Sequence, residues 1–129
     1  MRNYFQGVTT VPAVTVGERH VGRVTILDLE GDVTINAGTT ALRRETRRLI
    51  AAGRPDLLLN LARVRYVDSS GLGEMVAAQL AARRAGGRAA LLAPTPNVRE
   101  VFEVTRMAQV FDIYGDEAGA LRGMASGRD

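Results

Sequence analysis

The sequence predicts a single α/β domain, built on a mixed β-sheet of about four to five strands with helices mainly on one face. From Thr34 onward, short apolar runs alternate with segments of helical periodicity, a pattern typical of parallel strands joined by helices. Before Thr34, two segments rich in β-branched residues flank a turn of glycine and charged residues, which predicts an antiparallel hairpin. The chain has 129 residues, 46% of them hydrophobic, so it suits one domain with a sizeable core and is too short for two ordinary ones.

The predicted domain covers residues 12–125. Residues 1–11 are interpreted as a flexible leader that takes no part in the fold. The run from Asn3 to Gly7 resembles a fragment of a protease site used in expression tags, which favours a tag scar at this end. Residues 126–129 are expected to form a frayed C-terminus.

The N-terminal hairpin is predicted from residues 13–16 and 23–30, which are apolar and β-branched, with residues 17–22 as the turn between them. Gly31 and Asp32 are expected to break the second strand, because this pair disfavours extended structure. Residues 33–35 then form a brief third strand.

A first helix is predicted up to residue 52, with Asn36 or Thr39 as its N-terminal cap. Its end is well defined, because Gly53 is favourable just after a helix and Pro55 prevents continuation. Residues 56–61 follow as a short apolar run, which indicates a buried strand.

The chain then passes through Tyr66-Val67-Asp68-Ser69-Ser70-Gly71-Leu72-Gly73, which brings two serine hydroxyls, a carboxylate and two glycines together after the buried strand. A second helix is predicted over residues 70–85, since apolar residues recur at helical spacing until Gly86-Gly87. A helix N-terminus offers unpaired N–H groups and a partial positive charge. It therefore binds either a capping hydroxyl or a phosphate, and capping alone is the simpler interpretation of any single serine.

The C-terminal part is predicted to contain a strand over residues 88–93 and a helix introduced by Thr95-Pro96, in which a capping hydroxyl precedes a proline at the first helical position. A last short strand is predicted over residues 110–112 and a terminal helix over residues 116–125. The residues expected to form the core are Leu42, Leu49, Leu72, Val76, Leu80, Val101 and Phe102.

The composition excludes several kinds of site. The sequence has no cysteine, which excludes disulfides and thiolate metal ligands, and neither a metal nor a cofactor is predicted. All 17 basic residues are arginine, and with 14 acidic residues the net charge is +3. The densest basic group, Arg43-Arg44 with Arg47-Arg48, is interpreted as an exposed helix face, because no aromatic residues interleave with it as they do in nucleic-acid sites.

A membrane-inserted form is not expected, because no apolar run approaches the length of a membrane span and no signal-peptide pattern opens the chain. The expected location is the cytoplasm.

An enzyme is not predicted, and no catalytic residue is assigned. The one histidine, His20, falls in the predicted turn, and the sequence has neither a GxxxxGK[ST] nor a GxGxxG motif. The alternative is an acid–base pair at the ends of strands. It would draw on Asp28, Glu30, Asp32 and Asp68, for which solvated turn acids are the simpler interpretation.

The run Asp68-Ser69-Ser70-Gly71-Leu72-Gly73 resembles the signature of the STAS domain, the family of bacterial anti-sigma factor antagonists. In that family the serine directly after the aspartate is phosphorylated, which implies phosphorylation of Ser69, with Ser70 as the second candidate. The resemblance runs over residues 14–120 and implies a STAS-like fold. The chain departs from the family at Asn60, where an aspartate is usual, and this removes a charge near the expected site.

The resemblance implies a bacterial regulator of transcription that acts by partner switching. Unmodified, it would bind an anti-sigma factor that is also a Ser/Thr kinase; phosphorylated, it would release that kinase until a Ser/Thr phosphatase resets it. ATP belongs to the kinase, and direct contact with nucleic acid is not implied. The alternative is a non-switching STAS subunit of a stress-sensing assembly or of a transporter complex. The partner-binding residues expected around Ser69 are Asp68, Ser70, Gly71, Gly73, Glu74, Gly31, Asp32 and Thr34.

Overall fold

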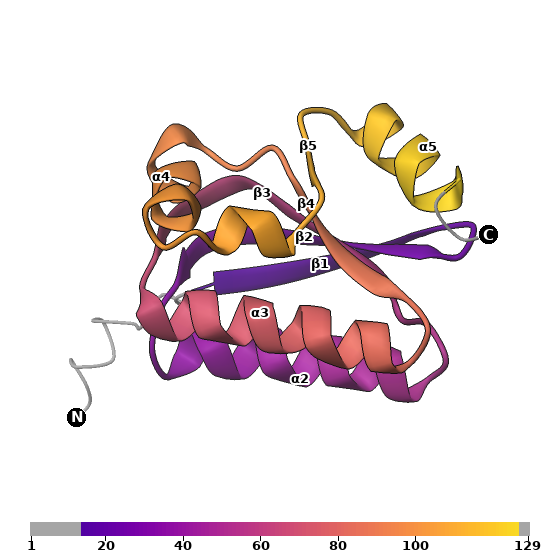
Figure 1. Cartoon of the computed structure of the whole chain (residues 1–129). Coiled ribbons are helices and arrows are strands. Elements are labelled where there is room, and N and C mark those ends of the chain that lie inside the picture. The colour runs from indigo at the N-terminus through magenta and orange to yellow at the C-terminus, as the bar shows by residue number, and fades with distance from the viewer. Residues whose placement is uncertain (1–13, 127–129) are drawn as a thin grey trace, which may run out of the picture.

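The computed structural model describes residues 14–126, and the predicted leader lies outside the described residues. Its five-stranded sheet has the order β1-β2-β3-β4-β5, so each strand pairs with its neighbours in the sequence (Figure 1). The β1–β2 pair is antiparallel and the other three pairs are parallel. The predicted mixed α/β sheet with an opening hairpin is therefore confirmed.

The regular elements follow one another as predicted, with different lengths. The strands are β1 (Val14–Val21), β2 (Val24–Val33), β3 (Asp56–Val67), β4 (Arg88–Leu92) and β5 (Ile113–Tyr114). The helices are α2 (Ala37–Ala51), α3 (Ser69–Arg84), α4 (Pro96–Val104), the 3₁₀ helix η1 (Met107–Val110) and α5 (Glu117–Ser126).

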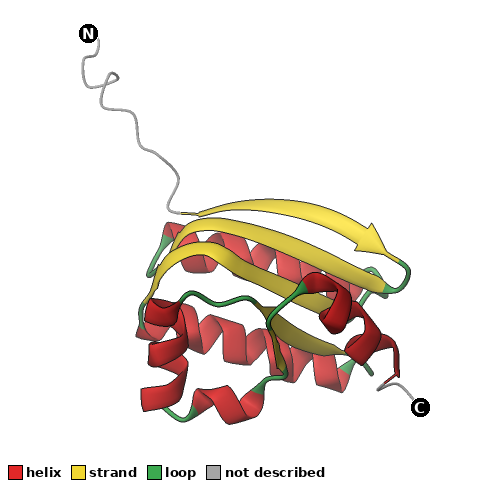
Figure 2. Ribbon diagram, turned by 90° about the horizontal axis from the view of Figure 1, so that it is seen from above, coloured by secondary structure: helices red, strands yellow, loops and turns green. Residues whose placement is uncertain are grey.

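Two apolar layers lie on opposite faces of the sheet. Helices α2 and α3 lie side by side across one face and α5 lies on the other, as Figures 1 and 2 show. The larger layer, between the sheet and α2, α3 and α4, includes Leu42, Leu49, Leu72 and Phe102, which confirms these predicted core residues. The smaller layer, beneath α5, contains Val24, Ile26, Leu58, Ala90, Leu92, Ala120 and Met124.

The hairpin is longer and tighter than predicted. Strand β1 continues through the residues expected to form a turn, and only Gly22 and Arg23 connect it to β2. Strand β2 also continues through Gly31 and Asp32, which were expected to break it. Instead, its register against β3 shifts between Gly31 and Asp32, as in a β-bulge, so Val33 belongs to β2 and not to a separate strand.

The predicted start and stop residues of the helices lie at or next to the observed helix ends. Gly53 and Gly86 both have positive φ, and the amides that follow fold back onto the last turns of α2 and α3 in the hydrogen-bond pattern of Schellman motifs. Thr95 caps α4, since its hydroxyl accepts a hydrogen bond from the Val98 amide. Asn36 occupies the N-cap position of α2, but its side chain makes no capping bond.

The predicted strand over residues 110–112 is wrong. Val110 ends η1, and β5 begins only at Ile113. The reason is core packing: Phe111 is buried and its ring meets Phe102 edge-on at 5.6 Å between centroids. The chain is thus turned inward at Phe111 before it can join the sheet edge.

The predicted register of α3 is wrong near its middle. Leu80, expected in the core, is 47% exposed, whereas Gln79 is only 2% exposed. The Gln79 amide nitrogen donates to the Val110 carbonyl at 2.9 Å, and its oxygen accepts from the Ala89 amide at 2.7 Å. Strand β5 pairs with β4 only at Leu91 and Leu92, so it does not reach the Ala89 amide. Gln79 supplies the hydrogen-bond acceptor that a longer β5 would have offered to this amide. Two other predicted core residues, Val76 and Val101, are half-buried.

This arrangement predicts that Gln79→Leu destabilises the protein although it makes α3 more apolar. The buried Ala89 amide would lose its acceptor, at a cost of about 1–3 kcal/mol. The neighbouring Leu80→Gln serves as the control and should change the free energy of unfolding by less than about 0.5 kcal/mol. Urea unfolding of both variants measures the difference, and equal stability of the two would contradict the register described here.

Candidate functional site

The Asp68 carboxylate joins three segments at the junction of β3 and α3. Asp68 is the N-cap of α3, and its Oδ1 accepts a hydrogen bond from the Gly71 amide at 2.8 Å. Its Oδ2 accepts from the Ile35 amide at 3.0 Å, in the loop between β2 and α2. One side chain therefore fixes the start of α3 against the neighbouring loop.

The same contacts keep Asp68 ionised. The Gly71 amide is the main cause that lowers the pKa of the Asp68 carboxyl, and the Ile35 amide adds to it. Partial burial acts in the opposite direction and is outweighed. Since each oxygen accepts an amide hydrogen bond, from α3 and from the β2–α2 loop, the carboxylate holds the site together.

Ser69 and Ser70 form the first turn of α3. Ser69 is exposed and Ser70 is half-buried. Among residues 14–126, no hydrogen bond is made by either hydroxyl. Because Asp68 takes the capping role, the Ser69 hydroxyl is left accessible at a helix N-terminus, so the capping interpretation of Ser69 does not hold.

The two glycines of the turn differ in role. A Cβ atom on Gly71 would lie 2.0 Å from the Val33 carbonyl oxygen, so Gly71 lets α3 pack directly on β2. Gly71 is buried and was expected to contact a partner; the structure places it against β2 instead. Gly73 is exposed, and a Cβ there would meet nothing within 4 Å, so its surface is open.

Glu74 does not face solvent, contrary to the expectation of a contact residue. It is 6% exposed, and its Oε1 accepts from Nε of Arg43 on α2 at 3.0 Å. Its Oε2 is buried without a hydrogen-bond partner in the described part of the chain. The exposed member of this pair is Arg43, whose side chain is 60% exposed, and no local sequence pattern indicates that the two would meet.

The end of β2, and not a loop, lies beside the turn. Asp32 pairs in register with Tyr66, and Val33 with Val67, so Gly31, Asp32 and Thr34 reach the same end of the sheet as Ser69. All three are half-buried. Asp32 is held by Arg65 through two hydrogen bonds of 3.2 Å.

Exposed apolar residues that were not among the expected contact residues also gather at this end. Ile35 is 62% exposed and Tyr66 is 58% exposed. Tyr66 also lines a surface pocket of about 310 Å³ with Val101 and Val104 of α4. Tyr66 is the first residue of the motif, so its position in the sequence could have indicated a contact residue. Val104 can be assigned to this surface only from the position of α4 in the fold.

The four carboxylates considered for acid–base chemistry do not meet in one site. Asp28 binds Arg19 and accepts from the Asn60 amide at 2.8 Å, while Asp68 binds backbone amides. Asp32 pairs with Arg65 and Glu30 with Arg63. Within the described residues, no group of three or more His, Asp or Glu side chains is placed to hold a metal ion.

Asn60 proves to be a structural residue of the sheet. Its amide nitrogen donates to Asp28 on β2, and its oxygen accepts from the Ala62 amide at 3.1 Å. An aspartate at this position could not donate to Asp28, so the departure from the family pattern is matched by a local hydrogen bond.

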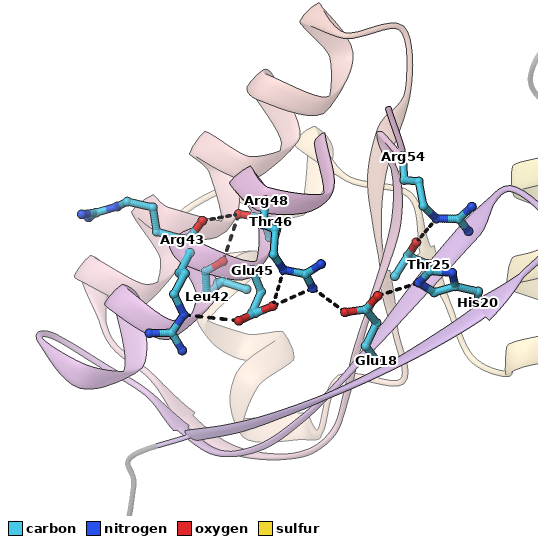
Figure 3. Close-up of polar contacts among 10 residues, drawn as sticks. Glu18, His20, Thr25, Leu42, Arg43, Glu45, Thr46, Arg48 and Arg54 are labelled. Carbon is cyan, nitrogen blue, oxygen red and sulfur yellow. Dashed lines mark hydrogen bonds and ion pairs between the residues drawn. The ribbon is translucent and has the colours of Figure 1, made fainter. Parts of the chain in front are cut away.

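His20 lies in β1 and not in a turn. It contacts Glu18, which also binds Arg48 of α2, and Arg48 binds Glu45 in turn (Figure 3). The hydrogen bond with His20 is the main cause that lowers the pKa of Glu18, followed by that with Arg48. This chain of ion pairs fastens α2 to the edge strand, far from Ser69 in the fold.

Comparisons with known proteins agree with this fold. A family model described as "Mlab, STAS domain" matches residues 16–114. Among solved structures, an anti-sigma factor antagonist from Mycobacterium paratuberculosis is 21% identical, with 92% of this chain and 99% of that chain covered and a TM-score of 0.77.

Two further structures show the same fold. The Bacillus cell fate determinant SpoIIAA in its phosphorylated form is 23% identical, covers 84% and 97% of the two chains, and has a TM-score of 0.67. A STAS-domain protein from Planctomyces limnophilus is 22% identical, with coverage of 85% and 97% and a TM-score of 0.67. In residues 14–126, no helix is both long and apolar enough to cross a membrane.

The geometry of the glycines predicts different effects for two similar substitutions. Gly71→Ala should lower the free energy of unfolding by about 2 kcal/mol or more, because the new methyl group collides with the Val33 backbone. Gly73→Ala should be neutral or slightly stabilising, since the site is open and alanine is the better helix former. Thermal unfolding of both proteins tests this, and a stable Gly71→Ala protein would show that α3 does not pack as described.

The lowered pKa of Asp68 predicts a pH-dependent effect of Asp68→Asn. A depressed pKa in the folded state stabilises the protein above the unfolded-state pKa, and this contribution is lost as the pH falls through the folded-state value. The wild type should therefore exceed the variant in stability most at about pH 7, and the difference should shrink below about pH 4. Urea unfolding of both proteins across this range measures it; a constant difference would assign the stability to hydrogen-bond geometry and not to charge.

Proposed function

The chain belongs to the STAS-domain family, and on that premise we propose that it is an anti-sigma factor antagonist. Unmodified, it binds an anti-sigma factor Ser/Thr kinase in the bacterial cytoplasm and thereby permits transcription by the released sigma factor. Phosphorylation of Ser69 ends this binding, and a Ser/Thr phosphatase restores it. The chain itself needs no cofactor, because ATP is bound by the kinase.

The single observation that carries the proposal is the position of the Ser69 hydroxyl. It is exposed, has no hydrogen bond within the described residues, and stands at the first position of a helix whose cap is supplied by Asp68. A kinase requires such an accessible hydroxyl. The match to a SpoIIAA structure in the phosphorylated form is consistent with this role.

A phosphate on Ser69 would alter the surface without unfolding the domain. It adds roughly −1.5 to −2 charges, which the N-terminus of α3 can partly stabilise. The Asp68 carboxylate next to it is already ionised, so the local negative charge rises steeply. A partner surface that fits a small neutral hydroxyl would then meet a larger, strongly hydrated group whose negative charge adds to that of Asp68.

The proposed contact surface surrounds Ser69. It comprises Ser70, the open helix surface at Gly73, and the end of β2 from Gly31 through Asp32 to Thr34. Asp68 and Gly71 contribute by holding this surface in place. Glu74 contributes through Arg43, which it orients from beneath.

Ser69→Ala should resist phosphorylation and bind the kinase constitutively, whereas Ser69→Asp should bind it poorly. A loss of about 3 kcal/mol corresponds to more than a hundredfold weaker binding. The assay incubates the protein with ATP and the kinase from the native cell, maps the phosphate by mass spectrometry and measures affinity by calorimetry. Ser70→Ala is the matched control and should still be phosphorylated at Ser69.

Phosphate found only on Ser70 or on a threonine would defeat the site assignment. Phosphate on Ser69 without any change in affinity for the kinase would defeat the switching mechanism.

A second candidate is a non-switching STAS subunit of a transporter complex or of a stress-sensing assembly. The observation in its favour is that the matching family model is the one described as "Mlab, STAS domain". In this case the same end of the domain binds its partner permanently. Ser69→Asp and Ser69→Ala then change the affinity only through the size and shape of the new side chain, and not through a switch.

A further inference from the structure

The net positive charge of the protein is concentrated on two helices. Helices α2 and α3 carry six of the 17 arginines and only two of the 14 acidic residues, so their formal charge is +4. The rest of the chain, with 11 basic and 12 acidic residues, is close to neutral. We name the outer surface of α2 and α3 the arginine face; its members are Arg43, Arg44, Arg47, Arg48, Arg83 and Arg84.

The two acids on these helices are already used. Glu74 is buried beneath Arg43, and Glu45 binds Arg44 and Arg48. Three arginines of the face, Arg47, Arg83 and Arg84, are exposed, and their side chains form no ion pair or hydrogen bond within the described residues. Part of the face therefore carries positive charge that the domain itself does not compensate.

The shape of the face suits a protein surface. Helices α2 and α3 lie side by side (Figure 1), and the Arg43–Glu74 ion pair bridges them. Arg47 follows Arg43 by one helical turn on α2. On α3, the positions that follow Glu74 on the same side are Ala77 and Ala81, both half-buried, and then Arg84. Short side chains thus line the seam between the helices, and the arginines stand at its borders.

One end of the face lies on the same helix as Ser69. Glu74, which binds Arg43, follows Ser69 by five residues, about 7.5 Å of helix rise and about 140° around the helix axis. Charges are screened beyond about 8 Å at physiological salt. A phosphate on Ser69 would therefore reduce the attraction of the face for anions mainly at its Arg43 end.

We infer that the arginine face binds an acidic surface of the same protein partner that contacts Ser69. This inference rests on the proposed function, and it further specifies that the partner's contact surface is acidic. Charge complementarity favours an acidic partner, and phosphorylation would then weaken binding partly through repulsion of that partner. A protein is favoured over single-stranded nucleic acid because neither α2 nor α3 contains an aromatic residue on which bases could stack.

The test uses the full chain as bait in extract of the native cell, and the retained protein is then purified and titrated by calorimetry. Arg47→Glu and Arg84→Glu should each weaken its binding about three- to fivefold, and the double variant at least about tenfold. Arg23→Glu at the hairpin turn is the control: it changes the net charge equally, is exposed without a partner in the described residues, and should leave affinity unchanged. Affinity of the wild type should also fall more steeply than that of the double variant between about 0.05 and about 0.3 M salt.

The outcomes separate this inference from the proposed function. A partner that phosphorylates Ser69 but binds all the arginine variants like wild type overturns the inference alone. A partner that loses affinity with Arg47→Glu and Arg84→Glu but does not phosphorylate Ser69 overturns the proposed switch and supports the face. Retention of no protein overturns both, as does tighter binding of the arginine face to a random-sequence DNA duplex than to the retained protein.

Discussion

The site depends on one carboxylate with two backbone donors. Asp68 accepts from Gly71 within α3 and from Ile35 in the β2–α2 loop, so the helix start and the loop cannot move independently. Because the carboxylate fills the capping position, the next residue, Ser69, is the first of the helix and its hydroxyl remains free. A serine in the capping position would have turned its hydroxyl inward to the helix amides. The order Asp-Ser therefore separates a structural acceptor from an accessible hydroxyl.

Close contact between α3 and β2 fixes the start of α3, and with it Ser69, against the sheet. Gly71 packs on the Val33 carbonyl, and Gly38 of α2 approaches Asp32 and Val33 almost as closely. Both helices thus begin on the same short stretch of β2, whose bulge turns the strand at this point. The consequence is that the end of β2, the β2–α2 loop and the start of α3 form one continuous surface around Ser69, although they are up to 40 residues apart in the sequence.

The electrostatic organisation follows from the use of arginine alone as the basic residue. On the sheet face beneath α5, Arg19 binds Asp28 and Glu117 together and so connects β1, β2 and the C-terminal helix. On the opposite face of the same edge strand, Arg48 connects α2 to Glu18 on β1. Planar guanidinium groups suit such shared contacts, because one side chain can serve two carboxylates. On the outer surface of α2 and α3, by contrast, the side chains of Arg47, Arg83 and Arg84 have no acidic partner within the described residues.

The sequence by itself determined the order and type of almost every element, together with the site motif. Local signals were sufficient there: Gly53 and Gly86 end helices, Thr95-Pro96 begins one, and Asp68 caps another by accepting from the amide of Gly71, three residues later. The tertiary structure alone decided which side chains are buried where local periodicity is ambiguous. Gln79 is buried and Leu80 exposed because an edge of β4 lacks a strand partner, a fact that depends on the length of β5. Glu74 is covered because Arg43 arrives from a different helix, and Gly71 is a packing residue because β2 passes beneath it. Each of these outcomes depends on contacts between segments that are distant in the sequence. A local pattern of residues cannot predict them, because it does not show which distant segments will pack together.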